Sequence, residues 1–217
     1  MPPKAILAGI LIVGFAGTLP LWLAGTPEQK QRMAQSTTTM QMIEQSVGNL
    51  ELRPEEKERL RQDLQPQQEI QPSFEETVWM QDMRQLIGRQ VPDDHEAESI
   101  ARWVYIYSQR FDLSPELVLA VIAVESQFDH FAVSNVGAHG LMQVMPFWKK
   151  ELGSKSDNLF EIETNIRYGC AILRLYKDRY RSLERALAAY NGSLGSRRYP
   201  KKIFAVMKRF NASSDDL

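Results

Sequence analysis

The hydrophobic pattern of the chain begins with a long apolar stretch near the N-terminus. No charged residue lies between Lys4 and Glu28, and this stretch is almost wholly apolar. Its length falls between the core of a signal peptide and a full membrane span. Cleavage after Ala24 would put Trp22 where signal peptides need a small residue, which favours an uncleaved anchor. We assign residues 1–25 to a signal peptide or a membrane anchor and expect the remainder to leave the cytoplasm.

The next part of the chain has no sustained apolar period. Between residues 26 and 72, Gln, Glu, Met and Thr dominate and no aromatic residue occurs. Glu55 and Arg59 are four residues apart, a spacing that supports a short charged helix within residues 54–64. A solvated tether with partial helicity is the stronger expectation, because such a segment buries little apolar surface. We predict a flexible polar linker over residues 26–74.

From residue 75 onward the apolar residues recur at helical spacing. Residues 75–92 form a short helical lead-in that ends near Gly88 and Pro92. The next helix carries one apolar stripe, whose members are Ile100, Trp103, Val104, Tyr107 and Phe111. Further helices are expected at residues 165–180, 182–190 and 200–210, and no segment is typical of a strand. The pattern predicts a mainly α protein, with one helical domain over residues 93–210 and a tail over residues 211–217.

One helix of this domain is apolar on every side. Ser114, Pro115 and Glu116 form a typical start, and the eight residues 117–124 are all apolar, so this helix should be buried. Glu125 ends the run. Such surroundings solvate a carboxyl group poorly and raise its pKa, so that it can donate a proton near neutral pH. The alternative is a glutamate at a helix end that turns to water.

The segments after this glutamate carry polar groups suited to sugars. Asn135, Gly137 and Gly140 mark turns that bring the chain back across the end of the buried helix. Sugar hydroxyl and N-acetyl groups need neutral donors and acceptors beside an apolar wall. The candidate binding residues are Ser134, Gln143, Met145, Tyr190 and Asn191.

Composition and charge narrow the function classes. The chain has 217 residues, 43% of them hydrophobic, and a net charge of −1, so it is a globular protein and not an obvious nucleic-acid binder. Residues 165–210 contain twelve Lys and Arg against two acids. These cations form either a basic face for an anionic polymer or an ordinary solvated surface, and charge alone favours the latter. Cys170 is the only cysteine, which excludes an internal disulfide, and its neighbours at helical spacing suggest a buried position.

Three short motifs occur in order along the domain: Glu125-Ser126, Gly140-Leu141-Met142-Gln143 and Ala189-Tyr190-Asn191. With Gly137-Ala138-x-Gly140 and Asn165-Ile166-x-x-Gly169, they resemble the soluble lytic transglycosylase (SLT) family over about residues 95–205. The resemblance implies a lysozyme-like helical domain. Ser193 stands where that family usually has a glycine, and Gly192 or Gly195 is expected to supply the turn instead.

The resemblance also implies a role for each candidate residue. Glu125 would be the catalytic acid and then the base, and Ser134 and Gln143 would hold the N-acetylmuramic acid unit. Met145 and Tyr190 would line the cleft, and Asn191 would support the loop near the glutamate.

The implied reaction needs a single carboxylate. The C6 hydroxyl of muramic acid attacks its own C1 after Glu125 protonates the glycosidic oxygen, and a 1,6-anhydro sugar results. Asp129, the nearest other acid, is expected to cap the chain or face solvent. Two alternatives remain: a goose-type lysozyme that uses water, and a non-catalytic module that binds the wall.

The expected setting is the bacterial envelope. The N-terminal apolar stretch predicts a periplasmic protein that is anchored in the inner membrane or secreted through an N-terminal signal. The resemblance implies that it acts on peptidoglycan strands without a cofactor or a metal. Partners in cell-wall or secretion machinery are compatible with it, and no nucleic acid is expected to bind.

Overall fold

The computed structural model describes residues 52–66, 72–153 and 156–214. Within these ranges the chain forms helices joined by loops, and the backbone pairing is limited to two isolated bridges, Val133 with His139 and His139 with Val144. The prediction of a mainly α fold is confirmed. The helices are α2 (Pro54–Asp63), α3 (Phe74–Ile87), α4 (Asp94–Arg110), α5 (Pro115–Glu125), α6 (Phe147–Leu152), α7 (Ile162–Arg179), α8 (Leu183–Tyr190) and α9 (Arg198–Ser214).

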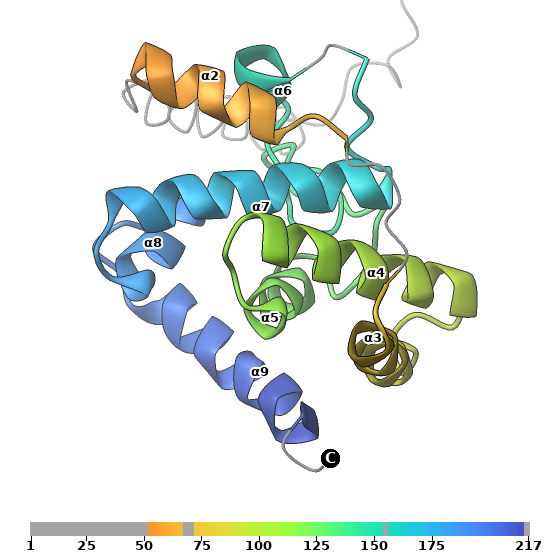
Figure 1. Ribbon diagram of the computed structural model, residues 1–217. Helices are drawn as coiled ribbons and strands as arrows, with labels where there is room; N and C mark the ends of the chain where they lie inside the picture. The colour runs from red at the N-terminus through yellow and green to blue at the C-terminus, as the bar shows by residue number, and fades with distance from the viewer. Residues whose placement is uncertain (1–51, 67–71, 154–155, 215–217) are drawn as a thin grey trace, which may run out of the picture.

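The apolar helix predicted from the sequence lies at the centre of the fold. The Oγ of Ser114 accepts a hydrogen bond from the Leu117 N–H, and Pro115 opens the first turn of α5. Residues 117–122 are all buried. Figure 1 shows α5 below α4, with α7 on the other side of α4 and α9 beyond α5 towards the C-terminal end. Helix α5 packs chiefly against α9 and α4, which explains why no side of it is polar.

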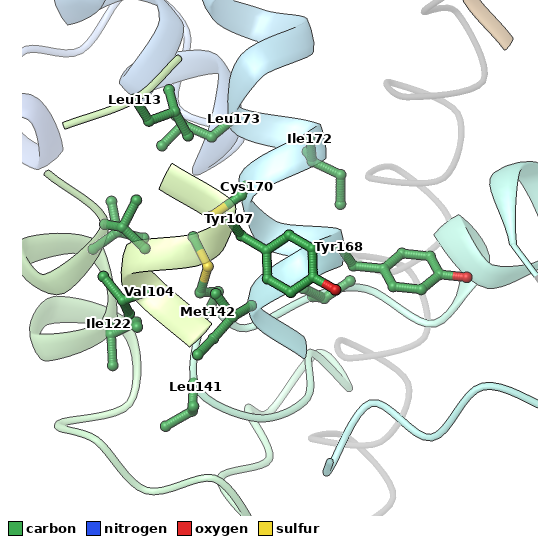
Figure 2. Packing of buried hydrophobic residues seen from close by; sticks show 14 of the residues in the cluster. Val104, Tyr107, Leu113, Ile122, Leu141, Met142, Tyr168, Cys170, Ile172 and Leu173 are labelled. Atoms are coloured by element: carbon green, nitrogen blue, oxygen red, sulfur yellow. The ribbon is translucent and has the colours of Figure 1, made fainter. Parts of the chain in front are cut away.

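The core is continuous from α4 through α5 to α7. Figure 2 shows Val104 of α4 beside Ile122 of α5, the Tyr107 ring of α4 extending towards Tyr168 of α7, and Met142 near Cys170 of α7. Cys170 is fully buried, and burial raises the pKa of its thiol, so it packs as a small hydrophobic residue, as its spacing suggested.

Helix α2 lies within the segment predicted to be a flexible linker, yet it packs on the domain. Its Leu60 is buried, as is the C-cap residue Leu64. The buried Arg167 of α7 donates from Nη1 to the Leu64 carbonyl at 2.6 Å. Charged contacts add to this: Lys57 with Glu151 at 2.7 Å and Arg179 with Glu56 at 3.0 Å. Figure 1 places α2 along α7, at the end of the molecule opposite α9.

The expectations for the N-terminal region fall outside the described residues. The assignment of residues 1–25 to a signal or an anchor lies there, as do residues 26–51 and 67–71 of the predicted linker. Among the helices that the structure describes, none has the length and apolar character that a membrane crossing requires.

Candidate active site

Glu125 is the last helical residue of α5, where the buried helix reaches the surface of the domain. Ser126 follows and ties its own backbone N–H and its hydroxyl back to the Ile122 carbonyl, at 3.0 and 3.2 Å. Gln127 and Phe128 then adopt positive φ values of 55° and 68°. Two successive non-glycine residues in the left-handed region are strained, and the buried Phe128 ring holds this turn in place. The chain therefore reverses directly after the carboxylate.

The Glu125 carboxyl is partly buried and has one recorded hydrogen-bond partner. The Tyr199 hydroxyl, from the first turn of α9, donates to Oε1 at 2.6 Å. Burial raises the pKa of Glu125 above its ordinary value, while the Tyr199 hydrogen bond and the positive charge of Lys202 pull it back. The same burial, with the charge of Glu125, holds the pKa of Tyr199 well above its ordinary value. A carboxyl in this setting keeps its proton more readily than an exposed glutamate does.

No second carboxylate is among the groups of the described chain that shift the pKa of Glu125. Within the described chain, the groups that act on its pKa are Tyr199 and Lys202, and neither is acidic. Asp129 is exposed and accepts a hydrogen bond from the Phe131 N–H at 2.8 Å, so it caps the turn as expected. Glu125 is thus the carboxyl group of this region whose pKa is raised by burial.

Ser134 and Gln143 lie on the loop that follows this turn. The Ser134 Oγ accepts from the Ala138 N–H at 2.9 Å, which leaves the hydroxyl hydrogen to donate elsewhere. Gln143 has a positive φ of 49°, and its side-chain nitrogen donates to the carbonyls of Gly140 and Ala132, at 3.0 and 3.3 Å. The amide nitrogen of Gln143 therefore shapes the loop, and its Oε1 is the group left to accept a hydrogen bond from a ligand.

The buried side chain of Asn165 on α7 holds this loop. Its Nδ2 donates to the carbonyls of His139 and Leu159, at 2.8 and 2.7 Å, and its Oδ1 accepts from the Met142 N–H at 2.8 Å. A Cβ on Gly140 would collide with the Asn165 amide, and Gly140 has a φ of +69°. The glycine and the asparagine are thus two parts of one contact, which accounts for the presence of both in the motifs.

Tyr190 and Met145 border the same region. The Tyr190 hydroxyl donates to the Met142 carbonyl at 2.8 Å, and burial followed by the charge of Glu125 keeps the pKa of Tyr190 well above its ordinary value. The ring is therefore close enough to Glu125 for the two groups to interact. Met145 is buried, with 9% of its surface exposed.

Asn191 does not show the supporting contact implied by the resemblance. It caps α8, it is exposed, and the hydrogen bonds recorded for it involve its backbone. Beyond it, the N–H groups of Gly192 and Ser193 bond to the Ala189 and Ala188 carbonyls, at 3.0 and 2.8 Å, in a Schellman motif. Gly192 takes the left-handed position with a φ of +68°. Ser193 needs no positive φ, so the serine that replaces the usual glycine is accommodated.

Three residues of the site were not singled out by sequence reasoning. Tyr199 and Lys202 act on Glu125 from a helix far along the chain, and no local pattern relates them to it. Asn165 was noticed as part of a motif, but its contacts with the loop could not be read from spacing. The one available signal is the helical spacing of Tyr199 and Lys202, which are three residues apart and therefore neighbours on the surface of α9.

Comparisons with known proteins agree with the motifs. Residues 103–209 match the family model described as Transglycosylase SLT domain. A segment of 111 residues is 39% identical to a transglycosylase of Enterobacteria phage PRD1, covering 48% of this chain and 40% of that protein. A segment of 106 residues is 35% identical to membrane-bound lytic murein transglycosylase C of Pectobacterium atrosepticum, covering 41% and 30%.

A third relative is membrane-bound lytic murein transglycosylase F of Desulfosudis oleivorans, 36% identical over 95 residues, which cover 41% of this chain and 20% of that protein. The chain thus spans less than half the length of each of these relatives.

Proposed function

Residues 103–209 belong to the transglycosylase SLT domain family, and from that membership we propose that the protein is a peptidoglycan lytic transglycosylase. It cleaves the β-1,4 bond between N-acetylmuramic acid and N-acetylglucosamine without water and acts as a carbon–oxygen lyase. The observation that carries this proposal is the environment of Glu125: a carboxyl whose pKa is raised by burial, oriented by Tyr199, with no second carboxylate acting on it. One acid suffices for this reaction, whereas most glycosidases use two.

In the first step Glu125 is the acid. Its proton passes to the glycosidic oxygen as the bond between that oxygen and C1 of the muramic acid breaks. In the second step the ionised Glu125 accepts the proton of the C6 hydroxyl of the same sugar, and the C6 oxygen bonds to C1. The enzyme returns to its starting protonation state, and the product ends in a 1,6-anhydro ring. Lys202 supports the ionised state between the two steps, because its positive charge favours it.

The other site residues bind the substrate. The Ser134 hydroxyl donates and the Gln143 Oε1 accepts hydrogen bonds from the muramic acid unit, since these are the groups that the loop contacts leave available. Met145 and Tyr190 supply the apolar wall of the cleft. Asn191 contributes as the C-cap of α8, where it ends the helix and begins the following turn.

Product analysis tests the proposed reaction. Insoluble cell wall is digested with the protein, and the released fragments are weighed by mass spectrometry. We expect ends that lack the elements of one water relative to a hydrolysed end. Ordinary reducing ends would identify a goose-type lysozyme instead, and binding without any release would identify a non-catalytic wall-binding module.

The proposed setting is the bacterial envelope. Two of the similar proteins carry the words membrane-bound in their names, and the apolar stretch between Lys4 and Glu28 suits an anchor or a signal. We place the helical domain on the periplasmic side of an inner-membrane anchor, or outside the cell after secretion. Fractionation of cells that produce the full chain, followed by detection in the membrane, periplasmic and cytoplasmic fractions, tests this placement.

A further inference from the structure

Helix α9 carries a row of cations beside the candidate active site. Arg198, Lys201, Lys202 and Lys208 are all exposed. At about 100° per residue, these four positions fall within roughly a third of the helix circumference. The α9 sequence contains no acidic residue, so these charges are not neutralised within the helix. We call these four residues the α9 cation row.

The other basic residues of this part of the chain are engaged differently. Several lie in ion pairs with carboxylates of this domain or of α2, namely Arg167, Arg174, Lys177, Arg179 and Arg197. Within the described residues, no ion pair is recorded for the four members of the α9 cation row. Four of the exposed cations of residues 165–210 therefore gather on one helix face, while Arg181 and Arg185 are exposed outside α9.

The row begins at the catalytic candidate. Tyr199, which hydrogen-bonds Glu125, stands between Arg198 and Lys201, and Lys202 is near enough for its charge to act on the Glu125 carboxyl. From Arg198 to Lys208 the helix rises by about 15 Å. A polymer held with its scissile bond at Glu125 therefore has its adjacent substituents within reach of these cations.

The opposite side of α9 packs against the rest of the domain. Tyr199, Ile203 and Phe210 are buried, and α9 packs against α5, α8 and α3. None of the large exposed hydrophobic side chains of the described chain belongs to α9. A helix that inserts into a lipid surface needs a free apolar face beside its basic one. This arrangement favours a polyanion over a membrane as the partner of the row.

We propose that the α9 cation row binds the acidic stem peptides of peptidoglycan, so that the protein prefers strands that still carry their peptides over bare glycan. This inference rests on the proposed function, because peptidoglycan must enter the cleft. The recognising chemistry is that of ammonium and guanidinium groups with peptide carboxylates. Such exposed contacts are screened by salt, so the preference weakens as ionic strength rises.

The test measures binding separately from cleavage. The full chain carrying Glu125→Gln is mixed with intact cell wall, or with wall from which an amidase has removed the stem peptides, and the bound fraction is found by sedimentation. In this background Arg198→Gln, Lys201→Gln and Lys208→Gln are combined, while Lys202 is kept so that the site charge stays the same. A matched control removes three exposed charges elsewhere, by Arg59→Gln, Arg89→Gln and Lys150→Gln.

We expect the α9 triple variant to bind peptide-carrying wall about tenfold more weakly than the control at low salt, the scale of a few exposed ion pairs. On peptide-free glycan, which keeps the lactyl carboxylate that the amidase exposes on each muramic acid, the difference between the two variants should be smaller than on peptide-carrying wall. Equal binding of both variants to peptide-carrying wall would overturn the inference and leave the proposed function standing. If neither wall preparation binds, and the unaltered chain releases no fragments, the proposed function fails as well.

A lipid partner would give a different result. Vesicles of phosphatidylcholine are compared with vesicles that also contain phosphatidylglycerol, so that any contribution of the apolar N-terminal stretch is common to both. We expect no difference between the α9 triple variant and its control on either vesicle. A preference for phosphatidylglycerol that the triple variant loses, together with equal binding to both walls, would assign the row to a membrane surface and overturn the inference.

Discussion

Glu125 receives its hydrogen bond from a residue 74 positions farther along the chain. The apolar end of α5 favours the protonated carboxyl, and the Tyr199 hydroxyl fixes one of its oxygens in place. Proton donation needs the first property and directed transfer needs the second. Neither property is present in the side chain alone, so the residue is best understood together with the two helices that meet at it.

Replacing Glu125 by Gln removes the proton donor while keeping size and a hydrogen-bond acceptor for Tyr199. We expect the rate of release of soluble fragments from cell wall to fall by about 100- to 1000-fold, the usual contribution of a positioned acid and base. Asp129→Asn should cost far less, because Asp129 is exposed and only caps a turn. Similar large losses at both positions would contradict the single-carboxylate mechanism and favour a hydrolase with two carboxylates.

The raised pKa of Glu125 also predicts how stability depends on pH. The folded protein prefers the protonated carboxyl, so its contribution to stability is fully present below the ordinary pKa of 4.5 and is lost as pH rises through the folded value. The Glu125→Gln variant has no such proton to lose. We expect its unfolding free energy, measured by urea titration, to equal or exceed that of the parent above that range. The difference should shrink towards pH 4; a growing advantage of the variant on acidification would refute the assigned direction.

At the scale of elements, the loop that carries Ser134 and Gln143 is held from outside by α7. Regular strand pairing does not stabilise it, since only isolated bridges occur there. The Asn165 amide instead replaces that pairing with two hydrogen bonds to loop backbone, at Met142 and His139, and a third ties it to the Leu159 carbonyl before α7. This contact works only where the chain comes close to α7, which is why position 140 has to be glycine.

Gly140 and Gly192 have the same backbone conformation, so replacing each with alanine distinguishes the cost of backbone strain from the cost of a steric clash. Gly140 and Gly192 have φ values of +69° and +68°. Of the two, only Gly140 has atoms that a side chain would clash with: the Leu159 carbonyl oxygen would lie 2.6 Å from an alanine Cβ. Gly192→Ala should lower the unfolding free energy by about 1–2 kcal/mol through backbone strain alone. Gly140→Ala should cost at least about 2 kcal/mol more, since the loop or Asn165 must move. Urea unfolding of both variants measures the difference, and equal losses would contradict the clash.

Helix α2 belongs to the folded unit although its own sequence is polar. Its stabilising contacts come from elsewhere: from Arg167 and Arg179 of α7, from Glu151 of α6 and from Arg110 of α4, which donates to the Gln62 and Gln65 carbonyls. A buried arginine that loses its acceptor is costly, because its charge stays in apolar surroundings.

A chain that starts at Glu75 should therefore be less stable than one that starts at Leu52. The shorter chain loses the buried Leu60 and Leu64 side chains and leaves Arg167 without the Leu64 carbonyl. We expect the unfolding free energy to fall by on the order of 2 kcal/mol. Each buried leucine contributes about 1.5–3 kcal/mol. The shorter chain no longer bears the conformational entropy cost of ordering α2, which offsets part of that loss. Both chains are compared by thermal and urea unfolding. Equal stability of the two chains would show that α2 does not stabilise the domain and is a solvated tether.

At the scale of the whole molecule, α9 completes both the core and the site. It covers one side of the wholly apolar α5 and at the same time brings Tyr199 and Lys202 to Glu125. Figure 1 shows this helix at the end of the fold opposite α2. The last helix of the domain is therefore needed for packing and for chemistry together.

Removal of α9 should abolish cooperative folding, whereas removal of the last residues should not. A chain that ends at Ser196 exposes the side of α5 that α9 covers, and we expect dye binding to exposed apolar surface and loss of near-ultraviolet circular dichroism. A chain that ends at Phe210 keeps the three buried contacts of α9 and should unfold in one transition. A cooperative transition in the shorter chain would show that α9 is dispensable for the core.

Several properties of this protein follow from the sequence by itself. The apolar stripe of residues 100–111, the apolar run of α5 and its serine cap predict the helices and the buried centre, because periodicity and capping depend on neighbours within a few residues. Glu125 stands out for the same reason, since the run that makes its surroundings apolar is directly before it. The order of the motifs adds the resemblance to the SLT family, whose model residues 103–209 match.

Other properties were decided only by the tertiary structure. The hydrogen bond from Tyr199, the docking of α2 and the use of the Gln143 amide to shape its own loop join groups whose proximity depends on how helices pack. The same holds for the charges: the cations of α7 are paired and those of α9 stay exposed, although both segments are rich in Lys and Arg. No short window of residues contains these contacts, because each is formed by chain segments that meet only when the core has formed.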